Sequence, residues 1–338
     1  IVIWVAMFGA GARSSCYVDK VVDQAEARYI GFDPIANKVT RGLTNAQFGH
    51  DNFSVFGQYG TGAPTPVFTN QKVEWVTDSW DYNPLKAWVD GQTYHFAAIA
   101  PYNASYRAGT NYDYTSKKYT LGEITVDNNN QTDYMTAAPL DQVNSGASLV
   151  SFEFNHILSK IDFTFKPKTT SADETHWKIP VRIEITKIEL ADVPTINTYE
   201  ADAWKALDTP ETNKVTFSKG QGTSALVTTS YAGSGNPTLS DKTFDWLVVP
   251  QGTTVGDITK TLTITCDVYD AVTAGTKLKS GATASVDIKT NWAKNTYYTY
   301  TVSIGADILG TNPYITFDVA SANWGNTSSN NDLNVPTN

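Results

Sequence analysis

A period-two pattern over residues 296–304 is the feature that most constrains the fold of this chain. Alternate residues of a strand share one face. The more apolar face here carries Thr296, Tyr298, Tyr300, Val302 and Ile304. We therefore expect a strand that turns this face to a core. The opposite face, which we expect to meet water, carries Tyr297, Thr299, Thr301 and Ser303.

Composition extends this expectation to the whole chain. Tyr, Thr, Val, Phe and Trp are plentiful, whereas Leu, Met, Arg and Glu are sparse, which is typical of strands rather than helices. A chain of 338 residues exceeds one typical domain and suits two. Residues 139–147 interrupt the strand pattern. We predict an all-β protein of two tandem β-sandwich domains, at residues 29–146 and 147–324.

Strand-like runs separated by Gly- and Pro-containing turns occur in both predicted domains. The run at 94–101 is continuously apolar, so we expect it to lie centrally and to be buried on both faces. Residues 200–207 are the one stretch for which we expect a helical turn. The other predicted strands are 29–32, 38–43, 53–59, a hairpin over 67–75, 133–137, 152–165, 181–190, 214–217, 225–229, 244–249, 261–269, 282–288, 296–304 and 314–319.

Motifs for catalysis, metal binding and nucleic-acid binding are missing from the sequence. None of the four histidines stands in a tight ligand spacing, and neither cysteine has a motif-placed base. Carboxylate pairs such as Glu123 with Asp127, or Glu184 with Glu189, occur by chance in a chain of this size. The net charge of -9 comes without a Lys/Arg block that could bind phosphates. We expect no catalytic, cofactor or metal site and no nucleic-acid partner.

His156 is the histidine that most resembles a functional residue. It follows Phe152 and Phe154 at the strand period, which places it on the same face as both aromatic rings. We interpret it as a packed core residue with one satisfied ring nitrogen rather than as a catalytic group.

The chain opens with its only long apolar run, which is shorter than the roughly 18 residues needed to span a bilayer. We interpret residues 1–15 as a signal peptide, with cleavage before Cys16 and lipid attachment to its thiol. Arg13 departs from the apolar residue preferred at such sites, so ordinary cleavage after the apolar run is the alternative. Both routes export the chain. Residues 16–28 are then a flexible tether, and Cys266 has no disulfide partner.

A segment from about residue 102 to residue 130 is rich in tyrosine among Asn, Ser, Thr and Gly. Such side chains can form a sugar-facing surface, but they also cap small β cores and leave their hydroxyls in water. We favour the capping role and retain the sugar-facing surface as the alternative. The tyrosines concerned are Tyr102, Tyr106, Tyr112, Tyr114 and Tyr119.

Five landmarks occur in one order along the chain and together resemble the fimbrillin family of Bacteroidales surface lipoproteins and pilus subunits. They are residues 94–101, 152–165, 244–251, 291–304, and 315–324 with its closing Trp324. The resemblance covers about residues 29–324. It implies two transthyretin-like β-sandwiches and a role in fimbriae or surface attachment, at the cell outer membrane.

The family resemblance also implies a mechanism of assembly. In polymerising members, a trypsin-like protease cuts after an Arg, an N-terminal strand leaves, and another subunit fills the exposed groove by strand addition. Arg41 lies where that cut belongs, between the 29–32 and 53–59 strands, and the alternative is a solvated turn arginine. Ile30 and Phe32 would share a face and fill the first core until the strand is removed.

Residues 325–338 depart from what a donor strand needs. Only Leu333 and Val335 are apolar, and Pro336 removes a backbone donor just beyond them. We therefore predict an accessory or tip subunit rather than the main stalk unit, and we expect these residues to be disordered. The alternative function is a non-polymerising surface lipoprotein that binds glycans or host proteins through the Tyr-rich segment, and a lipid-anchored glycan hydrolase is a distant third.

Overall fold

The computed structural model describes residues 28–36, 48–143, 149–170, 175–206, 213–241, 244–251, 258–271, 275–310 and 315–324. Its regular elements are almost all strands, which confirms the predicted all-β fold. Cys16, Arg41, the predicted strand at 38–43 and residues 325–338 lie outside the described residues.

The named elements are strands and a single 3-10 helix, η2 (Ala306–Leu309). The strands are β1 (Phe32–Ala36), β2 (Asn52–Tyr59), β3 (Thr65–Val76), β4 (Ser79–Asp81), β5 (Thr93–Ala100), β6 (Tyr112–Asp113), β7 (Lys118–Tyr119), β8 (Gly122–Thr125), β9 (Met135–Ala137), β10 (Leu140–Val143), β11 (Val150–His156), β12 (Ser159–Pro167), β13 (Val181–Pro194), β14 (Ile196–Glu200), β15 (Ala203–Trp204), β16 (Lys214–Lys219), β17 (Val227–Tyr231), β18 (Trp246–Val248), β19 (Ile258–Asp270), β20 (Lys277–Thr290), β21 (Thr296–Ile304) and β22 (Ile315–Asn323).

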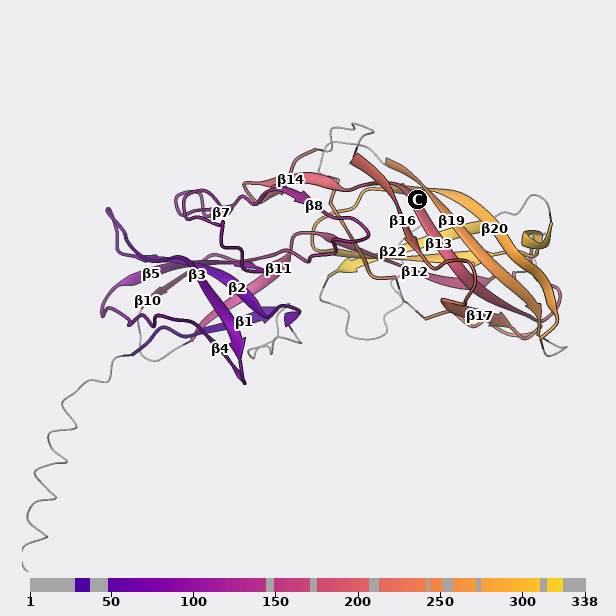
Figure 1. Ribbon diagram of the computed structural model, residues 1–338, viewed down its shortest axis with the longest axis horizontal. Helices are drawn as coiled ribbons and strands as arrows, with labels where there is room; N and C mark the ends of the chain where they lie inside the picture. The colour runs from indigo at the N-terminus through magenta and orange to yellow at the C-terminus, as the bar shows by residue number, and fades with distance from the viewer. Residues whose placement is uncertain are drawn as a thin grey trace, which may run out of the picture.

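The molecule is elongated, with β1 to β5 towards one end and β13, β19 and β20 towards the other (Figure 1). The first sheet has eight strands in the order β1-β11-β9-β5-β2-β3-β4, with β10 also paired to β5. β1 is parallel to β11, and β5 is antiparallel to β2, β9 and β10. Phe96 and Ile99 of β5 are fully buried in different clusters, so the predicted central strand, buried on both faces, is confirmed.

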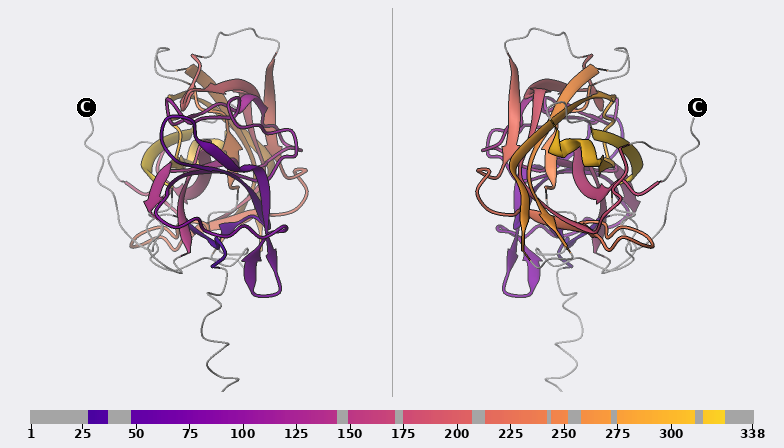
Figure 2. Two further views of the ribbon diagram at one scale, coloured as in Figure 1. Left: turned by 90° about the vertical axis from the view of Figure 1, so that its left-hand side faces the viewer. Right: turned by 90° about the vertical axis from the view of Figure 1, so that its right-hand side faces the viewer.

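Apolar packing curls the first sheet around a core of its own. Phe32 of β1 and Phe68 of β3 lie 5.3 Å apart between ring centroids, although four strands separate β1 from β3 in the sheet. Tyr82 and Trp88, from the segment after β4, are buried in the same cluster and close it. The end-on views show the β3–β4 hairpin projecting from the side of this body (Figure 2).

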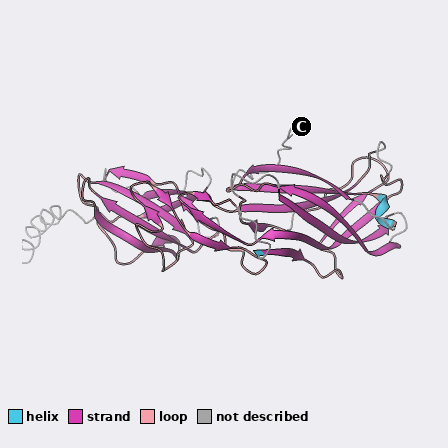
Figure 3. Ribbon diagram, turned by 90° about the horizontal axis from the view of Figure 1, so that it is seen from above, coloured by secondary structure: helices cyan, strands magenta, loops and turns pink. Residues whose placement is uncertain are grey.

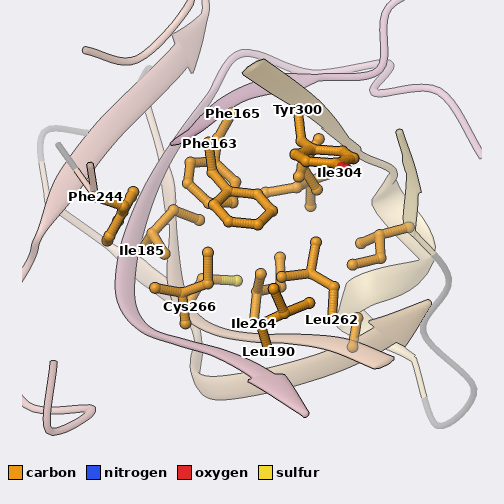
Figure 4. Close-up of a cluster of buried hydrophobic side chains, with 14 of the residues drawn as sticks. Phe163, Phe165, Ile185, Leu190, Phe244, Leu262, Ile264, Cys266, Tyr300 and Ile304 are labelled. Carbon is orange, nitrogen blue, oxygen red and sulfur yellow. The ribbon is translucent and has the colours of Figure 1, made fainter. Parts of the chain in front are cut away.

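A β-sandwich forms the other end of the molecule. One layer has the order β18-β12-β21-β22, and the other has the order β16-β13-β19-β20 with β17 also paired to β13. Alternate side chains from both layers meet in one buried cluster, which includes Phe163, Ile185, Leu262 and Tyr300 (Figure 4). Cys266 is buried in this core as a free thiol, and burial raises its pKa to about 12.

The two groups of strands follow one another along the long axis of the molecule (Figure 3). A third buried cluster lies where the two groups meet. It receives side chains from the convex face of the first sheet, from the Tyr-rich segment and from β14, β15 and β18. Hydrogen bonds cross the same junction. β8 pairs with β14, and the Gln131 side chain accepts from the Leu247 backbone N–H at 2.6 Å. The two ends therefore share packed side chains and backbone pairing.

Several predicted elements differ from the observed ones. The run 152–165 forms two strands, because Ile157 and Leu158 turn into the third cluster and divide β11 from β12. β11 pairs with the first sheet, although residues 147–324 were expected to form the second domain. The proposed hairpin over 67–75 is a single strand within β3, and β10 lies in the segment 139–147, where no strand was expected.

The helical turn predicted over 200–207 is wrong for the residues that the structure describes there. Glu200 pairs with Ala203 in a hairpin between β14 and β15. Ala201 and Asp202 have φ values of 51° and 65°, which is the geometry of a two-residue hairpin turn. The sequence lacks the Asn-Gly signal that usually announces such a turn.

The outer face of β21 is less exposed than its alternation predicts. Tyr300, Val302 and Ile304 face the core as expected, but Tyr297 is also buried. Its hydroxyl donates to Oδ2 of the fully buried Asp162 at 3.0 Å. Asp162 also accepts the backbone N–H groups of Phe163 and Phe244. Tyr297 is therefore buried against a satisfied carboxylate, although the pattern predicted that its side chain meets water.

Lys260 supplies a test of the sandwich core. Its side chain is fully buried on β19, its ammonium lies 5.9 Å from the Trp292 ring centre, and Nζ has no hydrogen-bond partner among the described residues. Burial lowers the pKa of Lys260 to about 8. The unfolded chain keeps this proton up to about pH 10.5, so the free energy of unfolding should rise with pH between about 8 and 10.5.

We predict that Lys260→Met raises the melting temperature at pH 7 by about 2 to 5 °C, because it removes a charge that lacks a partner. The advantage over the parent should shrink as the pH rises through that window. Differential scanning calorimetry at pH 7 and pH 10 measures both effects, and exposed Lys289→Met is the matched control. A lower melting temperature for Lys260→Met at pH 7 would contradict the assignment.

Candidate functional site: the seat of the N-terminal strand

Residues 28–36 lie as an extended segment between two other parts of the first sheet. On one side, the Ile30 N–H donates to the Lys86 carbonyl at 2.8 Å, and the Trp88 N–H donates to the Arg28 carbonyl at 2.9 Å. On the other side, the Val150 N–H donates to the Gly31 carbonyl at 2.8 Å. The segment then continues as β1 in parallel register with β11. We call the surface that receives residues 28–36 the strand seat.

Two side chains of the segment enter the first core, as the sequence predicts. Ile30 and Phe32 are 1% and 3% exposed, whereas Tyr29 between the Arg28 and Ile30 contacts is 54% exposed. Regular pairing with β11 begins at Phe32 rather than at Tyr29, which makes only an isolated bridge to Ala87. The predicted strand at 29–32 therefore lies at the expected place, but its regular part runs later along the chain.

Phe32 is enclosed by four aromatic rings of the first core. Phe152 of β11 stacks on it at 5.7 Å, and Phe68 of β3 meets it edge-on at 5.3 Å between ring centroids. The other two rings belong to Tyr82 at 5.3 Å and Phe96 at 6.1 Å. Edge-to-face and offset contacts of this kind add to the gain from burial.

The Tyr82 hydroxyl fastens the backbone of the seated strand. It donates to the Ile30 carbonyl at 2.7 Å and accepts from the Lys86 N–H at 3.1 Å. Burial raises the pKa of Tyr82, so the hydroxyl keeps its proton at neutral pH. Sequence analysis did not identify this residue, because nothing in the local pattern around it signals contact with a segment about fifty positions away.

The chain returns to the first core after residues 28–36. Phe48, the first residue described after position 36, is buried and packs against Phe154 at 4.8 Å and Trp80 at 5.6 Å between ring centroids. Arg41 lies between Ala36 and Phe48, outside the described residues. Both flanks of the predicted cleavage site are therefore anchored on the first sheet.

The interpretation of His156 as a packed core residue agrees with the structure. His156 is 9% exposed, its Nδ1 lies 2.8 Å from Oδ2 of Asp133, and its ring stacks on Trp324 at 3.7 Å. It is thus a packed residue with a satisfied ring nitrogen. His50 lies nearby, and burial lowers its pKa, with Asp133 acting in the opposite direction. Across the described residues, no three His, Cys, Asp or Glu side chains are grouped so that they could hold a metal ion.

The Tyr-rich segment forms a cap on the third cluster. Tyr106, Tyr112 and Tyr119 are all buried there, and Tyr114 packs against it partly buried. The Tyr119 hydroxyl donates to the Ala137 carbonyl at 2.6 Å. These side chains therefore cap a buried cluster as predicted, but the Tyr119 hydroxyl is buried and hydrogen-bonded rather than left in water.

Three of the four carboxylates that the sequence analysis attributed to chance pairing, Glu184, Glu189 and Asp127, have structural partners. Glu184 pairs with Arg182, and Glu189 pairs with Lys187 at 2.7 Å. Asp127 accepts the backbone N–H groups of the loop that follows it.

None of the helices that the structure describes has the length and apolar character to cross a bilayer.

The chain is similar to known proteins over most of its length. A family model described as fimbrillin-like matches residues 40–324. A curated relative, "Fimbrium subunit Fim1C" of Phocaeicola vulgatus, is 29% identical over 213 residues, and the match covers 53% of this chain and about half, 55%, of that protein. A solved structure of a fimbrial protein from Bacteroides vulgatus has the same fold, with a TM-score of 0.58 at 21% identity, and covers 88% of this chain and 99% of that one.

The strand seat predicts unequal effects for two neighbouring substitutions. Phe32→Ala should lower the free energy of unfolding by about 3 to 5 kcal/mol, because it leaves a cavity among four rings. Tyr29→Ala, at an exposed position of the same segment, should change it by less than about 0.5 kcal/mol. Urea unfolding followed by tryptophan fluorescence measures both values. Equal effects would show that residues 28–36 are not seated as described.

Proposed function

The chain belongs to the fimbrillin-like family, and on this premise we propose that it is an exported fimbrial subunit or fimbria-associated adhesin of the cell surface that assembles by protease-triggered strand exchange. The family assignment places the chain among structural proteins rather than enzymes. The observation that carries the proposal is the strand seat, since a short N-terminal segment there fills a core built by the rest of the first sheet.

Strand exchange follows from what the seat would expose after cleavage. If a protease cuts after Arg41, residues 28–36 are no longer covalently tied to the remaining chain. Their departure would uncover the rings around Phe32, leave the Val150 N–H without its acceptor and remove the nearer acceptor, at 2.7 Å, of the Tyr82 hydroxyl. A strand from another subunit restores both the apolar contacts and the hydrogen bonds, so it binds in place of the lost segment.

The subunit type and the anchor extend the proposal. Residues 325–338 contain only Leu333 and Val335 as apolar side chains, which favours an accessory or tip role over that of the stalk. Lipid on Cys16 would hold the uncut chain at the outer membrane until the cut after Arg41, and other fimbrial subunits would be the partners of the cut chain. The alternative, a surface lipoprotein that binds host proteins or glycans without polymerising, gains no support from the Tyr-rich segment, because three of its tyrosines are buried.

We predict that Arg41→Ala abolishes assembly, because the seated strand stays covalently attached. Blots of surface fractions should lose the ladder of high-mass polymers, and mass spectrometry should find the unprocessed chain. Arg28→Ala is the matched control, since it removes an arginine from the same region and leaves position 41 intact. Assembly of Arg41→Ala at the level of the parent would refute processing at this site.

We predict that the exported chain, before the cut after Arg41, begins at an acylated Cys16. Mass spectrometry of the membrane-extracted uncut protein should find the lipid-modified N-terminal peptide, and Cys16→Ser should release the uncut protein from the membrane fraction. Cys266→Ser is the control, because that thiol is buried in the sandwich. A mature chain with a free Cys16 thiol would remove the lipid anchor from the proposal.

A further inference from the structure

We infer that the strand seat selects its occupant by an aromatic residue: it accepts an extended segment of another subunit that runs parallel to β11, with an aliphatic residue in the place of Ile30 and an aromatic one in the place of Phe32. This inference rests on the proposed function, because it concerns the seat after residues 28–36 have left. It adds the chemistry by which the seat distinguishes one partner strand from another.

The direction and register of an incoming strand are set by hydrogen bonds to its backbone, which do not depend on its side chains. The Tyr82 hydroxyl donates to the carbonyl at position 30, and the Val150 N–H donates to the next carbonyl along the segment. Any extended chain supplies these two carbonyls. The contacts therefore place an incoming strand but cannot choose among sequences, so discrimination must come from the two pockets that face the core.

The pocket for Phe32 discriminates between side chains more strongly than the pocket for Ile30, and it prefers an aromatic ring. Its walls are the rings of Phe68, Tyr82, Phe96 and Phe152, which approach from different parts of the curled sheet. An aliphatic side chain is smaller and presents no ring edge or face, so it would leave unfilled space among groups that cannot close together. The rings of Phe68, Phe96 and Phe152 lie on separate strands whose spacing is held by the backbone ladder, and Tyr82 lies in the segment after β4.

The position of Gly31, between the two pockets, has a weaker preference for a small residue. A Cβ at Gly31 would lie 2.5 Å from Cδ2 of Leu149, but Leu149 is exposed and that atom is the end of its side chain. A small residue therefore fits directly, and a larger one requires only a rotation of Leu149. The partner pattern is an aliphatic residue, a preferably small residue and an aromatic residue.

Residues 325–338 do not carry this pattern, since they include no Phe, Tyr or Trp. This segment of a second copy is therefore a poor occupant of the seat. The fitting partner is a segment of a different subunit with an aromatic residue two positions after an aliphatic one.

The test uses the full chain with residues 38–43 replaced by the recognition sequence of a site-specific protease, so that cutting does not depend on Arg41. Circular dichroism confirms that the cut protein stays folded. Fluorescent peptides with the sequence of residues 28–36 then compete with the seated strand, and anisotropy and native mass spectrometry measure binding and displacement. The peptide set contains the native sequence, Phe32→Leu, Phe32→Ala, Tyr29→Leu as the exposed-position control, and a peptide of residues 325–338.

We expect the native and Tyr29→Leu peptides to bind alike, Phe32→Leu to bind roughly tenfold more weakly and Phe32→Ala to bind more than about a hundredfold more weakly. The 325–338 peptide should not displace the seated strand. In the Tyr82→Phe protein, all peptides should weaken by a similar factor while the Phe/Leu ratio stays unchanged, because the hydroxyl contacts only the backbone.

Two different failures can be told apart. If every peptide exchanges and Phe32→Leu matches the native sequence, or if the 325–338 peptide binds as well, the aromatic selection is overturned and strand exchange stands. If even the native peptide never replaces the cut segment, strand exchange itself fails, and the inference fails with it.

Discussion

The enclosure of Phe32 by four rings is the interaction on which the first sheet depends. It joins β1 to residues from β3, β5, β11 and the segment after β4, so one side chain spans a sheet whose order separates these strands. An open sheet would leave this face in water. Curling brings its two ends together, and the core that results includes a segment lying close to a predicted cleavage site. The same packing thus stabilises the fold and supplies the surface that a partner strand would use.

The third cluster gives the elongated molecule its continuity. Ile157 and Leu158 divide β11 from β12, and both side chains are buried at the junction. Pairing of β8 with β14 and the stacking of His156 on Trp324 tie distant parts of the chain across the same region. A junction made of packed rings and ladder hydrogen bonds resists bending more than a linker of similar length would.

Buried polar groups lie at positions where the packing of the folded chain differs from what hydrophobic alternation along the strands predicts. Asp162 is fully buried beneath Tyr297, on the face of β21 that alternation assigns to water, and two backbone N–H groups and the Tyr297 hydroxyl satisfy its carboxylate. Lys260 is buried without such partners among the described residues. Burial disfavours its charged form and therefore lowers its pKa. The contrast follows from hydrogen bonding, since a carboxylate that accepts three donors is stabilised where an unpartnered ammonium is not.

The sequence by itself determined the fold class and the identity of most strands, because period-two alternation and β-branched and aromatic composition are local properties. It also placed Ile30 and Phe32 on one face and His156 among aromatic rings, since both follow from the strand period. Only the tertiary structure decided which sheet each strand joins. The run 152–165 reads as one strand, yet the burial of Ile157 and Leu158 sends its halves to different sheets. The role of Tyr82 likewise depends on a contact with Ile30 across the curled sheet, and the turn at Ala201 and Asp202 depends on backbone angles that those residues do not announce. Such contacts join residues far apart in the chain, so no local pattern encodes them.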